Sequence, residues 1–271
     1  MSTSQVIQFR QLVWDYYHEH GRHDLPWRLD LSPYSIVISE VMLQQTQVSR
    51  VIEKYRQFVS EFPDWQALTA ASTTEVLCVW QGLGYNRRGL WLQQAAQRIV
   101  DDYKSELPTD PVELVKLPGI GPNTAGSIAA FVYDAPVVFI ETNIRRVFIH
   151  HFFADSLSVA DEELLPLITE ALDSEHPREW YWALMDYGSY LAKTVPNPNR
   201  QSKHHTVQSK FEGSDRQVRG EVLRQLLDGK VLTQAKLAKQ LGEPKTRVDK
   251  ILVRMTKDGL IVETADGYQI V

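Results

Sequence analysis

Apolar residues recur at helical spacing along most of the chain. The pattern is clear in residues 6–13 (VIQFRQLV), 48–59 and 90–100, where side chains three and four positions apart share one face. Short segments with Ser, Thr, Pro or Gly, such as 32–33 and 108–111, separate these stretches and are typical of helix starts and turns. The pattern predicts a mainly α body of ordinary helices joined by short loops.

The last quarter of the chain follows a different pattern. Residues 195–215 lose the periodicity and collect Pro, Asn, Ser and Lys, which is typical of a linker. Beyond them we expect three helices, over 216–227, after Thr233 and over 244–258, followed by two short strands joined at Asp266-Gly267. Three helices and a hairpin indicate a winged helix. The predicted domains are therefore 1–195, a linker over 196–213, and 214–271.

Composition excludes several classes of protein. The single cysteine, Cys78, rules out a disulfide within the chain and a multi-cysteine metal site, and its setting EVLCVWQGL predicts a buried helix face. The N-terminus has no signal-like apolar run and no later segment is as long and uncharged as a membrane helix, so we expect a cytoplasmic protein without a membrane partner.

Charge alone argues mildly against nucleic acid, because the formal net charge is -5 and phosphate binding favours excess Lys and Arg. Basic residues nevertheless cluster locally. In the third C-terminal helix, the spacing can place several on one side, as a helix that enters a DNA groove requires. The candidates are Lys245, Arg247, Lys250 and Arg254. The alternative is a protein-binding winged helix with a solvated basic face.

The segment LPGIGPNTAGSI, residues 117–128, predicts two helices that meet at a glycine turn. Gly119 and Gly121 leave backbone amides uncovered around Ile120, beside the start of the second helix. A phosphate oxygen can approach such amides closely and gains from the helix dipole. The turn therefore predicts a contact to the DNA backbone that does not read base sequence.

This hairpin resembles the helix-hairpin-helix of the endonuclease III and MutY superfamily of DNA glycosylases. The segments PYSIVISEVMLQQTQV (33–48) and WQGLGYNRR (80–88) resemble the MutY branch more closely. The resemblance extends from about Leu25 to Val147, and more loosely to Leu191. It implies a two-lobed helical glycosylase domain with a DNA cleft, acting as a monomer on double-stranded DNA that carries a mismatch or damaged base, at the nucleoid.

By this resemblance, Glu40 is the acid that protonates the adenine ring before the glycosidic bond breaks. The chemistry supports that role, because an oxocarbenium-like state needs a proton donor for the leaving base and a negative charge near the sugar. The second carboxylate of the family, an aspartate two residues before an asparagine, matches Glu141 and Asn143. Glutamate is a departure, since its extra methylene shifts the charge. Alternatively, Glu141 only stabilises a helix N-terminus.

Other family positions carry over residue by residue. Asn123 stands where bifunctional relatives have a lysine that attacks the sugar, and it cannot form a Schiff base, so we expect no lyase activity. Gln45 and Tyr85 match the residues that fill the gap left by a flipped base, and Arg28 matches a residue near that base. The alternatives are an ordinary surface glutamine and an ordinary core tyrosine.

Cofactors follow from the same resemblance. The hairpin of the family holds a monovalent cation through backbone carbonyls, which here are those of Val115, Leu117 and Ile120. Where the family has four cysteines, this chain has YLAKTVPNPNRQSKHHTVQ, so no iron-sulfur cluster can form there and packing or the basic linker must replace it. The winged-helix segment also stands in place of the separate domain that recognises 8-oxoguanine in that branch.

The sequence thus predicts a monofunctional DNA glycosylase of base excision repair, with adenine opposite guanine or 8-oxoguanine as the leading substrate. Three alternatives remain open. One is a glycosylase for thymine, uracil or another damaged base, and another is a non-catalytic DNA-binding protein on the same scaffold. The third is a transcription regulator that works through the winged helix.

Overall fold

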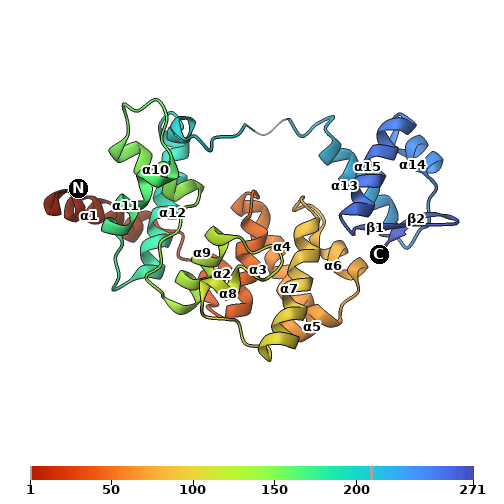
Figure 1. Ribbon diagram of the computed structural model, residues 1–271, viewed down its shortest axis with the longest axis horizontal. Coiled ribbons are helices and arrows are strands. Elements are labelled where there is room, and N and C mark those ends of the chain that lie inside the picture. The colour runs from red at the N-terminus through yellow and green to blue at the C-terminus, as the bar shows by residue number, and fades with distance from the viewer. Residues whose placement is uncertain (1, 208–209) are drawn as a thin grey trace. The chain divides into compact units, whose positions relative to one another are not determined.

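The computed structural model describes residues 2–207 and 210–271, most of which are helical (Figure 1). The chain divides into two compact units. The first is Met1–Glu40, Pro108–Lys116 and Ile120–Val207, and the second is Val41–Leu107, Leu117–Gly119 and Gln208–Val271. The predicted mainly α fold is confirmed. The predicted domain boundaries stay a prediction, and positions 208 and 209 of the predicted linker lie outside the described residues.

The first unit is an all-helical bundle. Its helices are α1 (Thr3–His20), α2 (Pro26–Leu29), the first eight residues of α3 (Pro33–Leu43), α8 (Pro111–Leu114), α9 (Pro122–Tyr133), α10 (Thr142–Phe152), α11 (Asp161–Ala171), α12 (Pro177–Thr194) and the 3-10 turn η1 (Pro198–Gln201). Ser2 and Gln5 form a capping box that starts α1. Val6, Phe9 and Val13 of the predicted apolar stretch are buried, whereas Ile7 and Leu12 are exposed. Helices α10 and α12 pack against each other (Figure 1).

Aromatic side chains fill the core of this unit. The Phe9 ring lies 5.2 Å from the Phe148 ring and 6.2 Å from the Trp180 ring, measured between centroids. These tilted and edge-to-face contacts tie α1, α10 and α12 together. Because side chains in such a core interdigitate at crystal-like density, the backbones of these three helices are held in fixed positions.

The second unit begins with another group of helices, which are α4 (Val48–Glu61), α5 (Trp65–Ala70), α6 (Thr73–Trp80) and α7 (Arg87–Tyr103). Helix α4 buries Val51, Tyr55 and Phe58, which are spaced by four and three residues as the hydrophobic pattern predicts. Ser72 and Glu75 form a capping box at the start of α6. A local signal thus fixes where α6 begins.

The C-terminal residues of this unit form α13 (Asp215–Leu226), α14 (Gln234–Leu241), α15 (Lys245–Lys257) and the strands β1 (Ile261–Thr264) and β2 (Gly267–Ile270). The strands pair antiparallel, with Ile261 opposite Ile270, and Leu232 adds an antiparallel bridge to Tyr268. Thr233 caps α14, as expected. Three helices followed by a hairpin confirm the predicted winged-helix arrangement.

Cys78 differs from the prediction, because it is exposed. Its neighbours Val76, Leu77, Val79 and Trp80 form the buried side of α6, so the cysteine is turned to the opposite side. Apolar neighbours in the sequence do not reveal which way a helical residue points.

A separate expectation concerns membranes. Among the described residues, no helix is long and apolar enough to span a bilayer.

Two glycine substitutions test this packing. In α9, a β-carbon on Gly126 would lie 2.6 Å from the β-carbon of Phe139, whereas a β-carbon on Gly220 in α13 meets no atom within 4 Å. We expect Gly126→Ala to lower the free energy of unfolding by roughly 1–3 kcal/mol through overpacking. Gly220→Ala should raise it by roughly 0.5–1 kcal/mol because alanine favours the helix. Urea unfolding followed by circular dichroism measures both, and equal effects would contradict the described contacts.

Candidate active site

Glu40 stands near the end of a largely apolar helix, α3, and its carboxyl group lies against α9. The side chain is partly exposed overall, yet protein atoms surround the carboxyl group. This desolvation raises the pKa of Glu40 to about 7, and the negative charge of Glu141 raises it as well. A hydrogen bond from Ser127 and the charge of Arg28 act in the opposite direction. Glu40 is therefore a carboxyl group that can hold or release a proton near neutral pH.

Ser127 on α9 is the hydrogen-bonding partner of Glu40. Its hydroxyl oxygen lies 2.6 Å from Oε2 of Glu40 and 2.9 Å from the carbonyl oxygen of Thr124. A hydroxyl has one proton and two lone pairs, so it can donate to either acceptor. When it donates to Thr124, its oxygen can accept the proton of a neutral Glu40. Ser127 thus accommodates both protonation states of this carboxyl group.

Glu141 caps the N-terminus of α10 with its own side chain. Its Oε1 accepts the backbone N–H groups of Asn143, at 2.6 Å, and Ile144, at 3.0 Å, and its Oε2 accepts the side-chain amide of Asn143 at 3.3 Å. Burial raises the pKa of Glu141, while these hydrogen bonds and the charge of Arg146 limit the rise. The alternative reading as a helix-capping carboxylate is therefore compatible with a second role, because the cap fixes the carboxylate in place.

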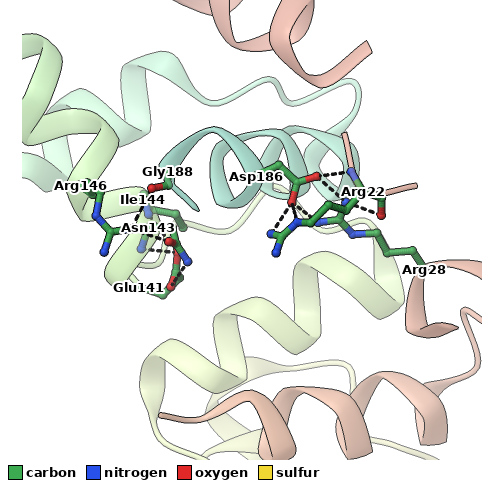
Figure 2. Close-up of polar contacts among 8 residues, drawn as sticks. All are labelled: Arg22, Arg28, Glu141, Asn143, Ile144, Arg146, Asp186 and Gly188. Atoms are coloured by element: carbon green, nitrogen blue, oxygen red, sulfur yellow. Dashed lines mark hydrogen bonds and ion pairs between the residues drawn. The ribbon is translucent and has the colours of Figure 1, made fainter. Parts of the chain in front are cut away.

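Arg146 and Gly188 both contact Asn143 (Figure 2). One guanidinium nitrogen of Arg146, Nη1, donates to Oδ1 of Asn143 at 2.6 Å and to the carbonyl oxygen of Gly188 at 2.8 Å. A β-carbon on Gly188 would lie 2.5 Å from the carbonyl oxygen of Asn143. Only glycine therefore allows α12 to approach the start of α10 this closely.

Arg28, on α2, is paired with Asp186, a buried aspartate on the helix that also carries Gly188, α12 (Figure 2). Its two terminal nitrogens donate to Asp186 at 2.8 and 2.9 Å, and Arg22 donates through its backbone N–H and its Nε at 2.7 and 2.6 Å. Burial favours a neutral Asp186, but Arg28 and then Arg22 hold its pKa below the usual range. The Arg28 guanidinium also lies 5.1 Å from the ring of Trp182. These contacts fix Arg28 as a rigid positive charge.

Gln45 and Tyr85 lie in loops of the second unit, and both adopt positive φ angles, of 55° and 47°. The buried Arg88 joins the two loops. It donates to the carbonyl oxygens of Val41, Met42, Gln44, Leu83 and Gly84 and to the hydroxyl of Thr46. Burial lowers the pKa of Arg88 to about 10. A buried cation that bonds to carbonyls of both loops explains how two strained backbones persist together.

The glycine turn has the local geometry that its sequence predicts. Gly119 has a φ of +79°, and α9 begins at Pro122 with Gly121 as its N-cap. A β-carbon on Gly121 would meet nothing within 4 Å, so one side of its backbone is open. Ile120 is buried and anchors the turn. Asn123 is exposed and accepts the backbone N–H of Ile140, which precedes Glu141, at 3.4 Å.

The four basic candidates on α15 differ in their surroundings. Lys245 and Lys250 are exposed, and Arg254 is exposed with a long contact of 3.6 Å to Asp215. Arg247 instead donates to both carboxylate oxygens of Glu243 at 3.0 Å and to Asp215 at 3.1 Å. Its guanidinium ties α15 to the start of α13. DNA contact by these four residues stays a prediction, and Arg247 has a structural task in addition.

The cofactor predictions are not tested by the structure. The one cysteine cannot supply the four thiolates of an iron-sulfur cluster. Within the part of the chain that the structure describes, no group of three His, Cys, Asp or Glu residues is arranged to hold a metal ion. The monovalent cation at Val115, Leu117 and Ile120 stays a prediction from the family resemblance.

Sequence reasoning missed several residues that support the candidate site residues. Ser127 and Asp186 are polar residues within apolar helices, and that interruption is the signal that points to them. Arg146 stands beside Arg145 in a basic pair, but Arg145 forms a two-pronged ion pair with Asp161, at 2.8 and 2.7 Å. The sequence could not show that adjacent arginines serve different partners.

Comparison with known sequences shows that the chain is similar to base excision DNA repair proteins. Residues 38–168 match the family model described as HhH-GPD superfamily base excision DNA repair protein. The chain is 34% identical to the adenine DNA glycosylase of Mycolicibacterium smegmatis strain ATCC 700084, over 93% of this chain and 92% of that protein. It is 38% identical to the adenine DNA glycosylase of Buchnera aphidicola subsp. Schizaphis graminum, over 54% of this chain but only 42% of that protein. The chain thus spans less than half the length of that second relative.

Among solved structures, a thermostable thymine-DNA glycosylase is similar with a TM-score of 0.63 and 19% identity. The alignment covers 73% of this chain and 92% of that one. At this level of identity the likeness concerns the fold, which is the helical fold described above.

The raised pKa of Glu40 makes stability depend on pH. The ordinary pKa of 4.5 applies to the unfolded chain, so the stabilising effect of the protonated form is present below pH 4.5 and is lost as pH rises through about 7. We expect Glu40→Gln to increase the free energy of unfolding by about 1–3 kcal/mol at pH 8, and by much less at pH 5. Denaturant unfolding at both pH values measures this. An increase of the same size at both would show that Glu40 is not protonated at pH 5.

Proposed function

We propose that this chain, which belongs to the adenine DNA glycosylase family, removes adenine mispaired with guanine or 8-oxoguanine from duplex DNA. The observation that carries the proposal is the pair of carboxyl groups in the first unit. Glu40 has a pKa of about 7, and Glu141 is fixed by the start of α10. Identity of 34% with an adenine DNA glycosylase over 92% of its length supports the same substrate.

The proposed mechanism divides the chemistry between these groups. Glu40 donates its proton to a ring nitrogen of the flipped adenine, and the bond between that base and the sugar then breaks with its electron pair going to the base. The sugar becomes an oxocarbenium-like cation, which the negative charge of Glu141 stabilises. Water adds to the sugar carbon and loses a proton to a carboxylate, which leaves an abasic site. Asn143 keeps the Glu141 carboxylate oriented through the hydrogen bonds described above.

The hydrogen bonds of the two carboxyl groups suit these roles. Glu141 accepts three N–H groups, which favour its charged form, whereas Glu40 has one hydroxyl partner that also fits a neutral acid. The charge of Glu141 helps to keep the proton on Glu40. When the surroundings of two titratable groups shift their pKa values in different amounts, the group with the higher pKa is assigned as the acid and the other as the charged group.

We propose further that DNA is held by residues outside this pair. The amides of the turn at Gly119, Ile120 and Gly121 bind a phosphate, and Gln45 and Tyr85 enter the duplex while Arg28 lies beside the flipped base. The basic residues of α15 add duplex contact. The protein acts as a monomer on nucleoid DNA in the cytoplasm, without an iron-sulfur cluster and with a monovalent cation at the hairpin.

Single-turnover assays test the proposal on duplexes with A opposite 8-oxoguanine, A opposite G, T opposite G and U opposite G, each followed by alkali. We expect excision from the adenine duplexes, with a rate constant that falls about tenfold per pH unit above pH 7 because the acid must be protonated. Glu40→Gln should slow excision by roughly 10²- to 10⁴-fold.

Binding measured on the same duplexes separates the alternatives. Tight binding of every duplex without base release, in wild type and Glu40→Gln alike, would identify a non-catalytic DNA-binding protein. Release of thymine or uracil with adenine untouched would keep the enzyme class and replace the substrate. Glu75→Gln is a matched control, because Glu75 is an exposed capping carboxylate of α6.

Asn123 gives a separate prediction about strand cleavage. An amide has no nucleophilic amine, so we expect no covalent complex after treatment with borohydride and no strand break before alkali. Asn123→Lys should gain borohydride-trapped complex in a gel assay, since the side chain at this position is exposed next to the Glu141 segment. A trapped complex in the wild type would show that another amine acts and that the enzyme is bifunctional.

A further inference from the structure

The segment Asn197–Ser202, which follows α12 and includes η1, contacts α10 in the first unit. Asn199 is buried, and its side-chain amide donates to the carbonyl oxygen of Thr142 at 2.9 Å. Thr142 is the first residue of α10 and stands between Glu141 and Asn143. The segment therefore binds the backbone at the point where the helix begins.

A second connection runs through a side chain. Oδ1 of Asn197 accepts the backbone N–H of Asn199 at 3.2 Å and Nε of Arg146 at 3.3 Å. Arg146 in turn donates to Asn143 at 2.6 Å. The segment thus reaches the Glu141 cap by two independent routes, one through the Thr142 carbonyl and one through Arg146.

Other contacts hold the far end of the segment without touching the cap. The side-chain amide of Gln201 donates to the carbonyl oxygens of Ala154 and Ser156 at 2.8 and 2.7 Å. The backbone carbonyl of Gln201 accepts the backbone N–H of Val159 at 2.7 Å. These bonds fix the segment to the loop after α10. The two ends of the segment therefore contact different parts of the unit. Asn197 and Asn199 contact α10, whereas Gln201 contacts the loop after it.

One further feature suggests why Asn199 is an asparagine. Its Oδ1 is buried and has no hydrogen-bonding partner among the described protein atoms. An unpaired buried acceptor is destabilising. An apolar residue of similar size would avoid that cost. The amide N–H that donates to Thr142 is therefore the group for which an asparagine is needed at this position.

We propose that Asn199 is a positioning residue, which holds the start of α10 so that Glu141 and Asn143 keep the geometry that excision needs. The inference rests on the proposed function for its effect on catalysis, while the effect on the cap itself is independent of any activity. A displacement of about an ångström in a preorganised site lowers a rate by about a hundredfold.

The test compares Asn199→Leu with Gln201→Met in the full-length protein. Leucine removes the donor and the unpaired oxygen together, so we expect this variant to fold with nearly unchanged thermal stability. Amide hydrogen exchange by NMR should show faster exchange at Asn143 and Ile144, whose N–H groups bind Glu141. The single-turnover rate constant on A opposite 8-oxoguanine should fall by about 10- to 100-fold, with the dissociation constant for the duplex changed less than about threefold.

Gln201→Met is the control, because it loosens the far end only. We expect a lower melting temperature, unchanged exchange at Asn143 and Ile144, and an excision rate within about twofold of wild type. Unchanged exchange at these two amides in Asn199→Leu, or an equal loss of rate in both variants, would overturn the inference. Wild-type protein that releases no base would overturn the proposed function, and the exchange comparison would still decide the role of Asn199.

Discussion

The arrangement of the first unit depends on the placement of two carboxyl groups where water is largely excluded. Each group loses hydration, and the charge of one raises the pKa of the other. Both cannot carry full charge without compensation. The chain compensates unequally, with three N–H groups and the charge of Arg146 at Glu141, and with one hydroxyl and the charge of Arg28 at Glu40. This inequality favours the charged form at Glu141 more than at Glu40, whose pKa rises to about 7.

Helix α12 provides much of that support. Gly188 lets the start of α10 approach and offers its carbonyl oxygen to Arg146, while Asp186, two residues earlier, fixes Arg28 (Figure 2). Both contacts require α12 to be immobile, and the aromatic core of α1, α10 and α12 provides that rigidity. Stability and chemistry are thus coupled, since a change that shifts α12 moves two charged groups at once.

The helical fold could be predicted well because its signals are local. The period of apolar residues and the glycine turn depend on neighbours within a few positions, and the helices formed where these signals indicated. Cys78 was placed wrongly for the same reason, because an apolar neighbourhood gives no direction to one side chain. The candidate carboxylates were found through a family resemblance and the needs of the reaction, which are also properties of short motifs.

The sequence by itself determined the helical elements and the single cysteine, and its resemblance to a known family named the two candidate carboxylates. Tertiary structure decided the direction in which the pKa of each carboxyl group moves, because desolvation depends on which helices surround a group. It also decided the partners of Ser127, Asp186 and Asn199, which lie 87, 158 and 57 positions from the residues they bind. No local pattern encodes such pairs, since chain segments this distant meet only when the whole unit has folded.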